Sequence, residues 1–221
     1  MNTELLIAAM FLAILDWIAV GRKWKKIEYF TKPGVMVIVL SWLLLMGGTH
    51  PGIIWFCIAV FFSLAGDIFL MLPKECFLVG LISFLIAHIA YILGLNQNMP
   101  PINLATLVIL VFILIISLTL YKRLSTRVRT EESQSLLFPV KVYLVVISIM
   151  LFSALATLVR IEWQELPAIL VSFGGLLFFI SDTILGWNKF IRPLPHGKLI
   201  TRMSYHSGQF LLILGGVIHY L

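Results

Sequence analysis

Three aspartates stand inside strongly apolar segments of the chain: Asp16, Asp67 and Asp182. A lysine follows each of them seven residues later: Lys23, Lys74 and Lys189. An ionised carboxyl within a membrane costs about 2.5 to 3.5 kcal/mol, so it normally faces the interior of a helix bundle or a watery cavity. There it serves as a general acid or base, as a proton relay, or as a structural hydrogen-bonding group. The spacing to the lysines places all three acids about 10 Å from the basic ends of their helices.

Other polar side chains are expected at the same level as these acids. They are Lys32, Lys141, Tyr143, Ser181, Tyr205, His206 and Gln209. His88 and Tyr91 lie one turn apart and therefore on one helix face. Taken singly, each tyrosine is equally well an interface residue, and His88 a satisfied interior histidine. Their convergence toward one end of the helices indicates a site.

The elements that carry these residues follow from composition. The chain has 221 residues, of which 61% are hydrophobic and 12% are charged, far from the balance of a water-soluble domain. Apolar runs long enough to cross a bilayer occur at about 4–20, 33–49, 53–72, 77–95, 102–121, 138–159, 165–187 and 200–220. They predict an all-α fold, a polytopic transmembrane bundle of eight helices, in which residues 1–221 form one integral membrane domain.

Charge predicts the orientation. Of the 16 Lys and Arg residues, all but Arg160 fall in connections on one side of the membrane. By the positive-inside rule this side is cytoplasmic and both termini lie outside. The net charge of +6 therefore indicates contact with anionic lipid headgroups and no nucleic-acid partner. We expect a multi-pass protein of a bacterial cytoplasmic membrane, and the sequence indicates no oligomeric state.

Three other interpretations of the acids were weighed. Asp16 precedes Trp17 and a basic connection, so it can extend to the interface. A zinc site built from Asp67, Asp182 and two histidines is disfavoured because His88 lies deeper and no helix carries His-x-x-x-His, so we expect no metal and no cofactor. A proton-coupled transporter is disfavoured because the prolines lie at helix ends, although this carrier and a non-catalytic lipid-binding protein remain alternatives.

Several short motifs together resemble one family. They are "TKP" at 31–33, "GD.FL" at 66–70, "F..GL.SFL.AHI.YI" at 77–92, "PV..Y..VI..M" at 139–150, "GG.LFFISD" at 174–182 and "Y..GQ.L" at 205–211. The pattern, from about Lys32 to Gln209, resembles the lysoplasmalogenase family of eight-helix membrane proteins, the YhhN-like family. The resemblance implies hydrolysis of the vinyl ether bond of lysoplasmalogens, giving a fatty aldehyde and glycerophosphocholine or glycerophosphoethanolamine. It also implies a lysophospholipid as the partner, bound from the bilayer.

The carboxylates suit that chemistry. A vinyl ether is cleaved once its β-carbon is protonated, because the resulting oxocarbenium ion is captured by water. Where two carboxyls share an apolar cavity, one can stay protonated near neutral pH while the other stays ionised. We therefore expect Asp67 and Asp182 to be catalytic, as in the two-carboxylate arrangement of glycosidases. The phosphate is expected on Lys32, Lys141 or Arg202, with the remaining polar residues named above in the substrate-binding wall.

Overall fold

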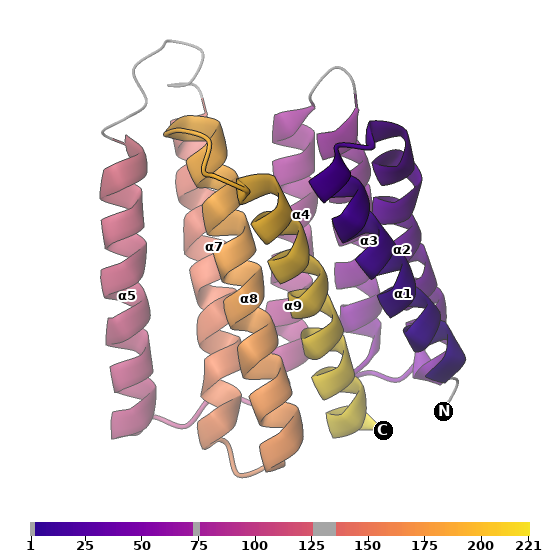
Figure 1. Cartoon of the computed structure of the whole chain (residues 1–221). Helices are drawn as coiled ribbons and strands as arrows, with labels where there is room; N and C mark the ends of the chain where they lie inside the picture. The colour runs from indigo at the N-terminus through magenta and orange to yellow at the C-terminus, as the bar shows by residue number, and fades with distance from the viewer. Residues whose placement is uncertain (1–2, 73–75, 126–135) are drawn as a thin grey trace. The chain divides into compact units, whose positions relative to one another are not determined.

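The computed structural model describes residues 3–72, 76–125 and 136–221, and eight long α-helices account for most of them (Figure 1). The helices are α1 (Thr3–Arg22), α2 (Lys25–Gly47), α3 (Ile54–Met71), α4 (Phe77–Leu95), α5 (Leu104–Ser125), α7 (Leu137–Ala156), α8 (Glu165–Phe190) and α9 (Gly197–Tyr220), with a short 3₁₀ helix η1 (Thr157–Val159) after α7. The chain divides into two compact units, residues 1–94 with 220–221 and residues 95–219. The single integral membrane domain over residues 1–221 stays a prediction.

Seven of these helices are long and apolar enough to cross a membrane, which confirms the predicted polytopic all-α bundle. The exception in the described chain is α9, which has the length but carries Tyr205, His206 and Gln209 in its first half. These polar side chains lower its mean hydropathy. The protein is therefore a multi-pass membrane protein in which the most polar long helix is the last one.

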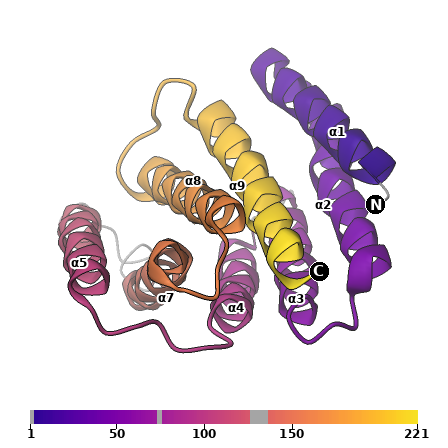
Figure 2. The ribbon, with the colours of Figure 1, turned by 90° about the horizontal axis from the view of Figure 1, so that it is seen from below.

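In the first unit α2 packs against both α1 and α3, as the view along the helices in Figure 2 shows. The turn between α1 and α2 is tight because Lys23 adopts a left-handed backbone conformation with φ of 60°. The amide of Trp24 then donates to the carbonyl of Ala19 at 2.8 Å, and that of Lys23 to Val20 at 3.2 Å. This pattern is a Schellman helix end. It sets α2 antiparallel to α1 immediately after the turn.

The start of α2 differs from its predicted position. The helix begins at Lys25, well before the predicted start at 33, and runs through Pro33. Proline at this place removes one backbone hydrogen bond but leaves the helix continuous. The two preceding residues, Thr31 and Lys32, are consequently buried helical residues rather than part of a connection.

In the second unit α7 packs against α5 and α8. The α8 and α9 backbones approach closely at two glycines. A Cβ at Gly174 would lie 2.5 Å from the amide nitrogen of Leu212, and one at Gly208 would lie 2.9 Å from the carbonyl oxygen of Gly174. Only glycine permits this approach, which aligns α9 along α8.

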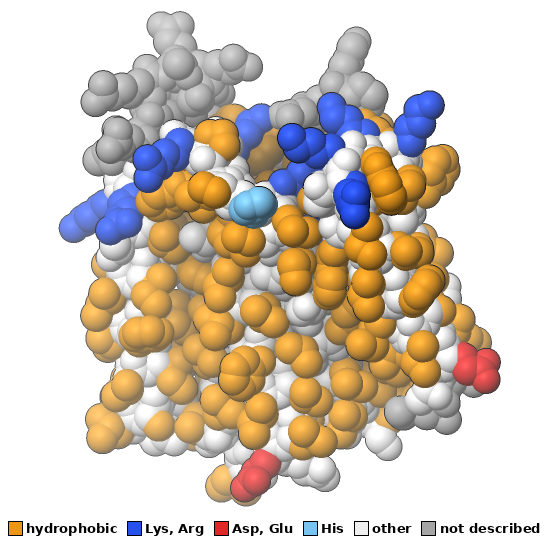
Figure 3. All heavy atoms as spheres, in the orientation of Figure 1, with side chains coloured by type: hydrophobic (Ala, Val, Ile, Leu, Met, Phe, Trp, Pro, Cys, Tyr) orange, Lys and Arg blue, Asp and Glu red, His pale blue; other side chains and the backbone are white. Residues whose placement is uncertain are grey.

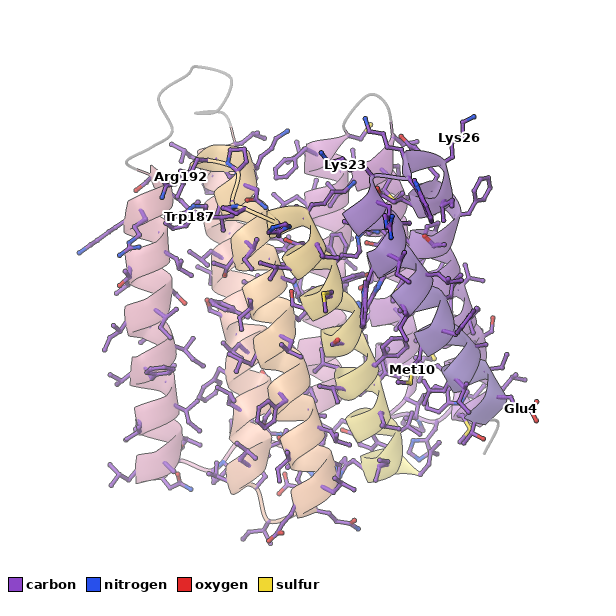
Figure 4. All side chains as sticks on the ribbon, viewed as in Figure 1. Glu4, Met10, Lys23, Lys26, Trp187 and Arg192 are labelled. Carbon is purple, nitrogen blue, oxygen red and sulfur yellow. The ribbon has the colours of Figure 1, made fainter. Side chains whose placement is uncertain are left out.

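Exposed basic and acidic side chains separate to opposite ends of the helices within each unit (Figure 3). In the first unit Lys23 and Lys26 lie at the α1–α2 turn, and Glu4 lies at the other end of α1 (Figure 4). In the second unit Arg192 follows the end of α8 (Figure 4). This distribution matches the basis of the predicted orientation, and the assignment of the basic ends to the cytoplasm stays a prediction.

Candidate functional site

A buried ion pair joins α2 to α3 in the first unit. Nζ of Lys32 lies 2.8 Å from Oδ1 of Asp67, and the two side chains are 10% and 1% exposed. Lys32 was predicted to contact a substrate phosphate, and the structure places its ammonium on this carboxylate. Breaking such a pair by removing one partner is costly, because the other charge is left buried.

The preceding residue on α2 holds another of the three acids. Thr31 shares its hydroxyl proton between Oδ1 of Asp16 at 2.7 Å and the carbonyl oxygen of Ile27 at 3.0 Å. Asp16 is fully buried, so its expected extension to the interface is wrong. Consecutive residues point about 100° apart around a helix, and α2 therefore contacts an acid on each of its two neighbours. Asp16 and Asp67 are both held from this one turn.

Asp182 lies in the second unit, where Tyr143 of α7 donates a hydrogen bond to its Oδ2. The neighbouring residue Ser181 is buried and donates to the carbonyl oxygen of Thr201 at 3.0 Å, which links α8 to α9. Asp182 itself is half-buried. The carboxylate of Asp182 thus contacts α7, and the side chain of the preceding residue contacts α9.

The predicted residues on α9 line up beside this acid-bearing helix. Tyr205, His206 and Gln209 are all buried, and the ring of Tyr205 meets Phe178 of α8 edge-on at 5.4 Å between centroids. Arg202 is also buried and lies one turn before Tyr205 and His206, on the same face. This is the polar first half of the helix that lowers its mean hydropathy.

Three predicted positions lie elsewhere. Tyr91 packs edge-on against Phe56 at 5.7 Å, and Phe56 precedes Asp67 on α3 by eleven residues, or about 16 Å of helix rise. His88 is fully buried on the same helix as Tyr91. Lys141 is exposed and lies over the ring of Tyr121 on α5, whereas Tyr143 faces α8.

Sequence reasoning missed two buried residues of α2, Thr31 and Glu28. Both precede Pro33, and the proline was taken as the start of the helix. The signal was present, because Glu28 and Lys32 have the four-residue spacing of one helix face.

Among the residues that the structure describes, no three His, Cys, Asp or Glu side chains converge as metal ligands. The absence of a metal requirement stays a prediction.

Comparison with known proteins identifies the relatives of this chain. A model of the YhhN family matches residues 27–216, which include Asp67 and Asp182 but not Asp16. The chain belongs to the YhhN family. This agrees with the resemblance found in the motifs from "TKP" to "Y..GQ.L".

The chain is also similar to proteins that are named lysoplasmalogenases. Lysoplasmalogenase TMEM86B of Mus musculus is 29% identical over 215 residues, covering 96% of this chain and 84% of that protein. The Sus scrofa TMEM86B is 31% identical over 71% of this chain and 60% of that protein. Lysoplasmalogenase TMEM86A of Bos taurus is 28% identical over 76% of this chain and 68% of that protein. No solved structure matches the chain significantly.

Proposed function

We propose that the protein hydrolyses the vinyl ether bond of lysoplasmalogen-type lysophospholipids within the membrane. The observation that carries this proposal is family membership, with relatives named lysoplasmalogenases that align over up to 96% of the chain. Buried and half-buried carboxylates on membrane-spanning helices support it independently. The proposed membrane is a bacterial cytoplasmic membrane, with the basic helix ends facing the cytoplasm.

The reaction needs one proton on carbon and one water. Protonation of the β-carbon of R–CH=CH–O–R′ gives an oxocarbenium ion, and water adds to it to form a hemiacetal. The hemiacetal then breaks its bond to the glycerol oxygen, which leaves as an alcohol, and the fatty chain leaves as the aldehyde R–CH₂–CHO. Water is the co-reactant, and the proton that it loses restores the acid.

We propose different roles for the two acids because their partners differ. Asp67 is buried with the Lys32 ammonium as its counter-ion, which suits a carboxylate that stays ionised and stabilises the oxocarbenium ion. Asp182 is half-buried, which suits a proton donor that must recover its proton from water, and the Tyr143 hydroxyl positions its carboxyl. A positioned general acid contributes about 10² to 10⁴-fold in rate.

The substrate-binding residues are proposed in two groups. Tyr143, Ser181, Tyr205, His206 and Gln209 lie on the helices that carry or flank Asp182, and we propose that they contact the glycerol and the ether oxygen. His88 and Tyr91, on α4, would line the apolar part of the substrate path. Arg202 is buried one turn before His206 and is the proposed phosphate partner, since the ammonium of Lys32 is on Asp67.

Release of fatty aldehyde by the purified protein tests the function. Lysoplasmalogens with choline and ethanolamine headgroups should yield aldehyde, whereas the matched 1-acyl lysophospholipids should be left intact. Activity should survive exhaustive chelation. Movement of lipid across liposomes without turnover would instead support the carrier, and saturable binding without either would support a lipid-binding protein.

A further inference from the structure

A groove runs along the second unit between α5 and α7. Its lining residues recur every three or four positions on each helix, as in Ser117, Leu118 and Tyr121 on α5 and Lys141, Val145 and Ser148 on α7. Its volume is about 380 Å³, within the range of small-molecule sites. The lining on α5 extends from Leu110 to Tyr121, about 16 Å of helix rise. That length is close to one leaflet of a hydrocarbon core about 30 Å thick.

The middle of the groove is apolar. Its two serines satisfy each other, with Oγ atoms 2.7 Å apart. Ser148 donates to the carbonyl oxygen of Leu144 at 2.6 Å, so Ser117 is the donor to Ser148. The other side chains between the ends of the groove are aliphatic or aromatic. A hydrocarbon chain matches this surface, because a polar occupant would find no further hydrogen-bonding groups there.

One end of the groove is basic. Lys141 lies 5.8 Å from the centre of the Tyr121 ring, which is a contact with an aromatic face. Lys122 and Arg123 follow Tyr121 in the last turn of α5, and both are exposed. Basic residues beside a groove between membrane helices favour an anionic lipid headgroup. The charge and the groove together have the polarity of a phospholipid, with phosphate at one end and hydrocarbon along the rest.

The packing of α5 gives such a lipid a structural role. Only Thr106 and Ile113 of its described residues are buried, so most of its surface is open to the bilayer. A chain lying in the groove would contact α5 and α7 at once and add packing that α5 otherwise lacks.

We propose that this groove binds an anionic membrane phospholipid, with one acyl chain between α5 and α7 and the phosphate on Lys141. The inference does not depend on the proposed hydrolysis. The sequence-based expectation placed Lys141 on the substrate phosphate. In the structure Lys141 faces α5, whereas Tyr143 faces α8 and Asp182. The proposed lipid is therefore distinct from the substrate.

Quenching of tryptophan fluorescence by brominated lipid tests the proposal directly. Leu118→Trp places a probe at the rim of the groove, and Ile115→Trp places one on the same helix at a position that does not line it, with Ile115 61% exposed. Both variants are reconstituted in phosphatidylcholine nanodiscs with increasing brominated phosphatidylglycerol or brominated phosphatidylcholine. The signal of the six native tryptophans is subtracted using the unsubstituted protein.

The Leu118→Trp probe should reach half-quenching at an about fivefold lower mole fraction of brominated phosphatidylglycerol than of brominated phosphatidylcholine, the preference expected from one lysine. The Ile115→Trp probe should respond equally to both lipids. Adding Lys141→Gln to Leu118→Trp should remove the preference while quenching persists, whereas adding Lys26→Gln should leave it. The proposal would be overturned if the two brominated lipids gave equal quenching curves at Leu118→Trp. It would also be overturned if Lys141→Gln left the preference for phosphatidylglycerol unchanged. Displacement of the brominated phosphatidylglycerol by a small fraction of lysolipid would also overturn it, by assigning the groove to a single-chain substrate.

Discussion

The ammonium of Lys32 lies 2.8 Å from the carboxylate of Asp67, and neither side chain is more than one-tenth exposed. The pair joins two helices that are both apolar enough to span the membrane. Each charge therefore compensates the other in a region where lipid offers no counter-charge. The pair also couples stability to the proposed chemistry, because Asp67 is one of the two proposed catalytic acids.

Lys32→Met should lower the free energy of unfolding by about 3 to 5 kcal/mol, because it leaves the Asp67 charge buried without this counter-ion. Asp67→Asn in the same chain should restore most of that loss, since no charge then remains to be compensated. Thermal unfolding in detergent measures both. Lys26→Met, at an exposed lysine of the same helix, is the matched control and should change little. A Lys32→Met variant as stable as the wild type would show that the ion pair contributes nothing to the stability of the fold.

Tyr143→Phe should lower turnover by up to about tenfold while the protein remains folded. The substitution removes the hydroxyl that donates to Asp182 and positions its carboxyl, and a hydrogen bond between neutral groups contributes about 0.5 to 1.5 kcal/mol. Aldehyde release under saturating substrate is the measurement. Tyr121→Phe is the control, because the ring that Lys141 contacts is kept. Equal activities in the two variants would remove Tyr143 from the site.

Gly208→Ala should destabilise the second unit by about 1 to 3 kcal/mol, because the added methyl meets the backbone of Gly174 and Phe178 at 2.9 Å. Gly186→Ala in the adjacent helix α8 is the control. A Cβ there has nothing within 4 Å, so the change should be neutral or stabilising by up to about 1 kcal/mol. Thermal unfolding that fails to separate the two variants would contradict the close packing of α8 on α9.

Sequence patterns predicted most of the fold because apolar length is a strong signal in a membrane. The predicted run at 77–95 coincides with α4. The predicted run at 165–187 begins with α8 and ends less than one turn before the end of that helix. The start of α2 was missed because Pro33 was interpreted as the first residue of the helix. A proline inside a helix cannot be distinguished from one at its start by hydropathy alone.

The sequence predicted which residue types lie at the depth of the candidate site. It did not predict which of these side chains contact each other. Asp67, Asp182 and Tyr143 were all named, but the Lys32–Asp67 and Tyr143–Asp182 pairings depend on the rotation of neighbouring helices. Periodicity within one helix does not determine that rotation. Asp16 shows the consequence, because its sequence neighbours suggested the interface and its structural neighbour is Thr31.

The predicted orientation of the protein in the membrane can be tested separately. One basic residue, Arg160, does not fall on the predicted cytoplasmic side. Arg160 is buried and donates to the carbonyl oxygens of Leu95 at 2.7 Å and Asn98 at 3.1 Å, and also to Asn96. Its charge is thus engaged in the protein, and it does not weaken the positive-inside assignment. A reporter fused after Leu221 should therefore be active only outside the cytoplasm. Cytoplasmic activity would reverse the orientation and place the proposed acids near the outer leaflet.

Asp67→Asn and Asp182→Asn should each lower aldehyde release by at least about 10²-fold. Asparagine keeps the size and hydrogen bonding of aspartate but can neither deliver a proton to carbon nor stabilise an oxocarbenium ion as an anion. The double variant should be little worse than either single one, because groups that act in one step are not additive. Asp16→Asn is the matched control: its remaining oxygen still accepts the Thr31 hydroxyl, so turnover should stay within about tenfold of wild type. Normally inserted Asp67 and Asp182 variants that keep turnover within a few-fold of wild type would leave these acids a structural role, with Lys32 and Tyr143 among their partners.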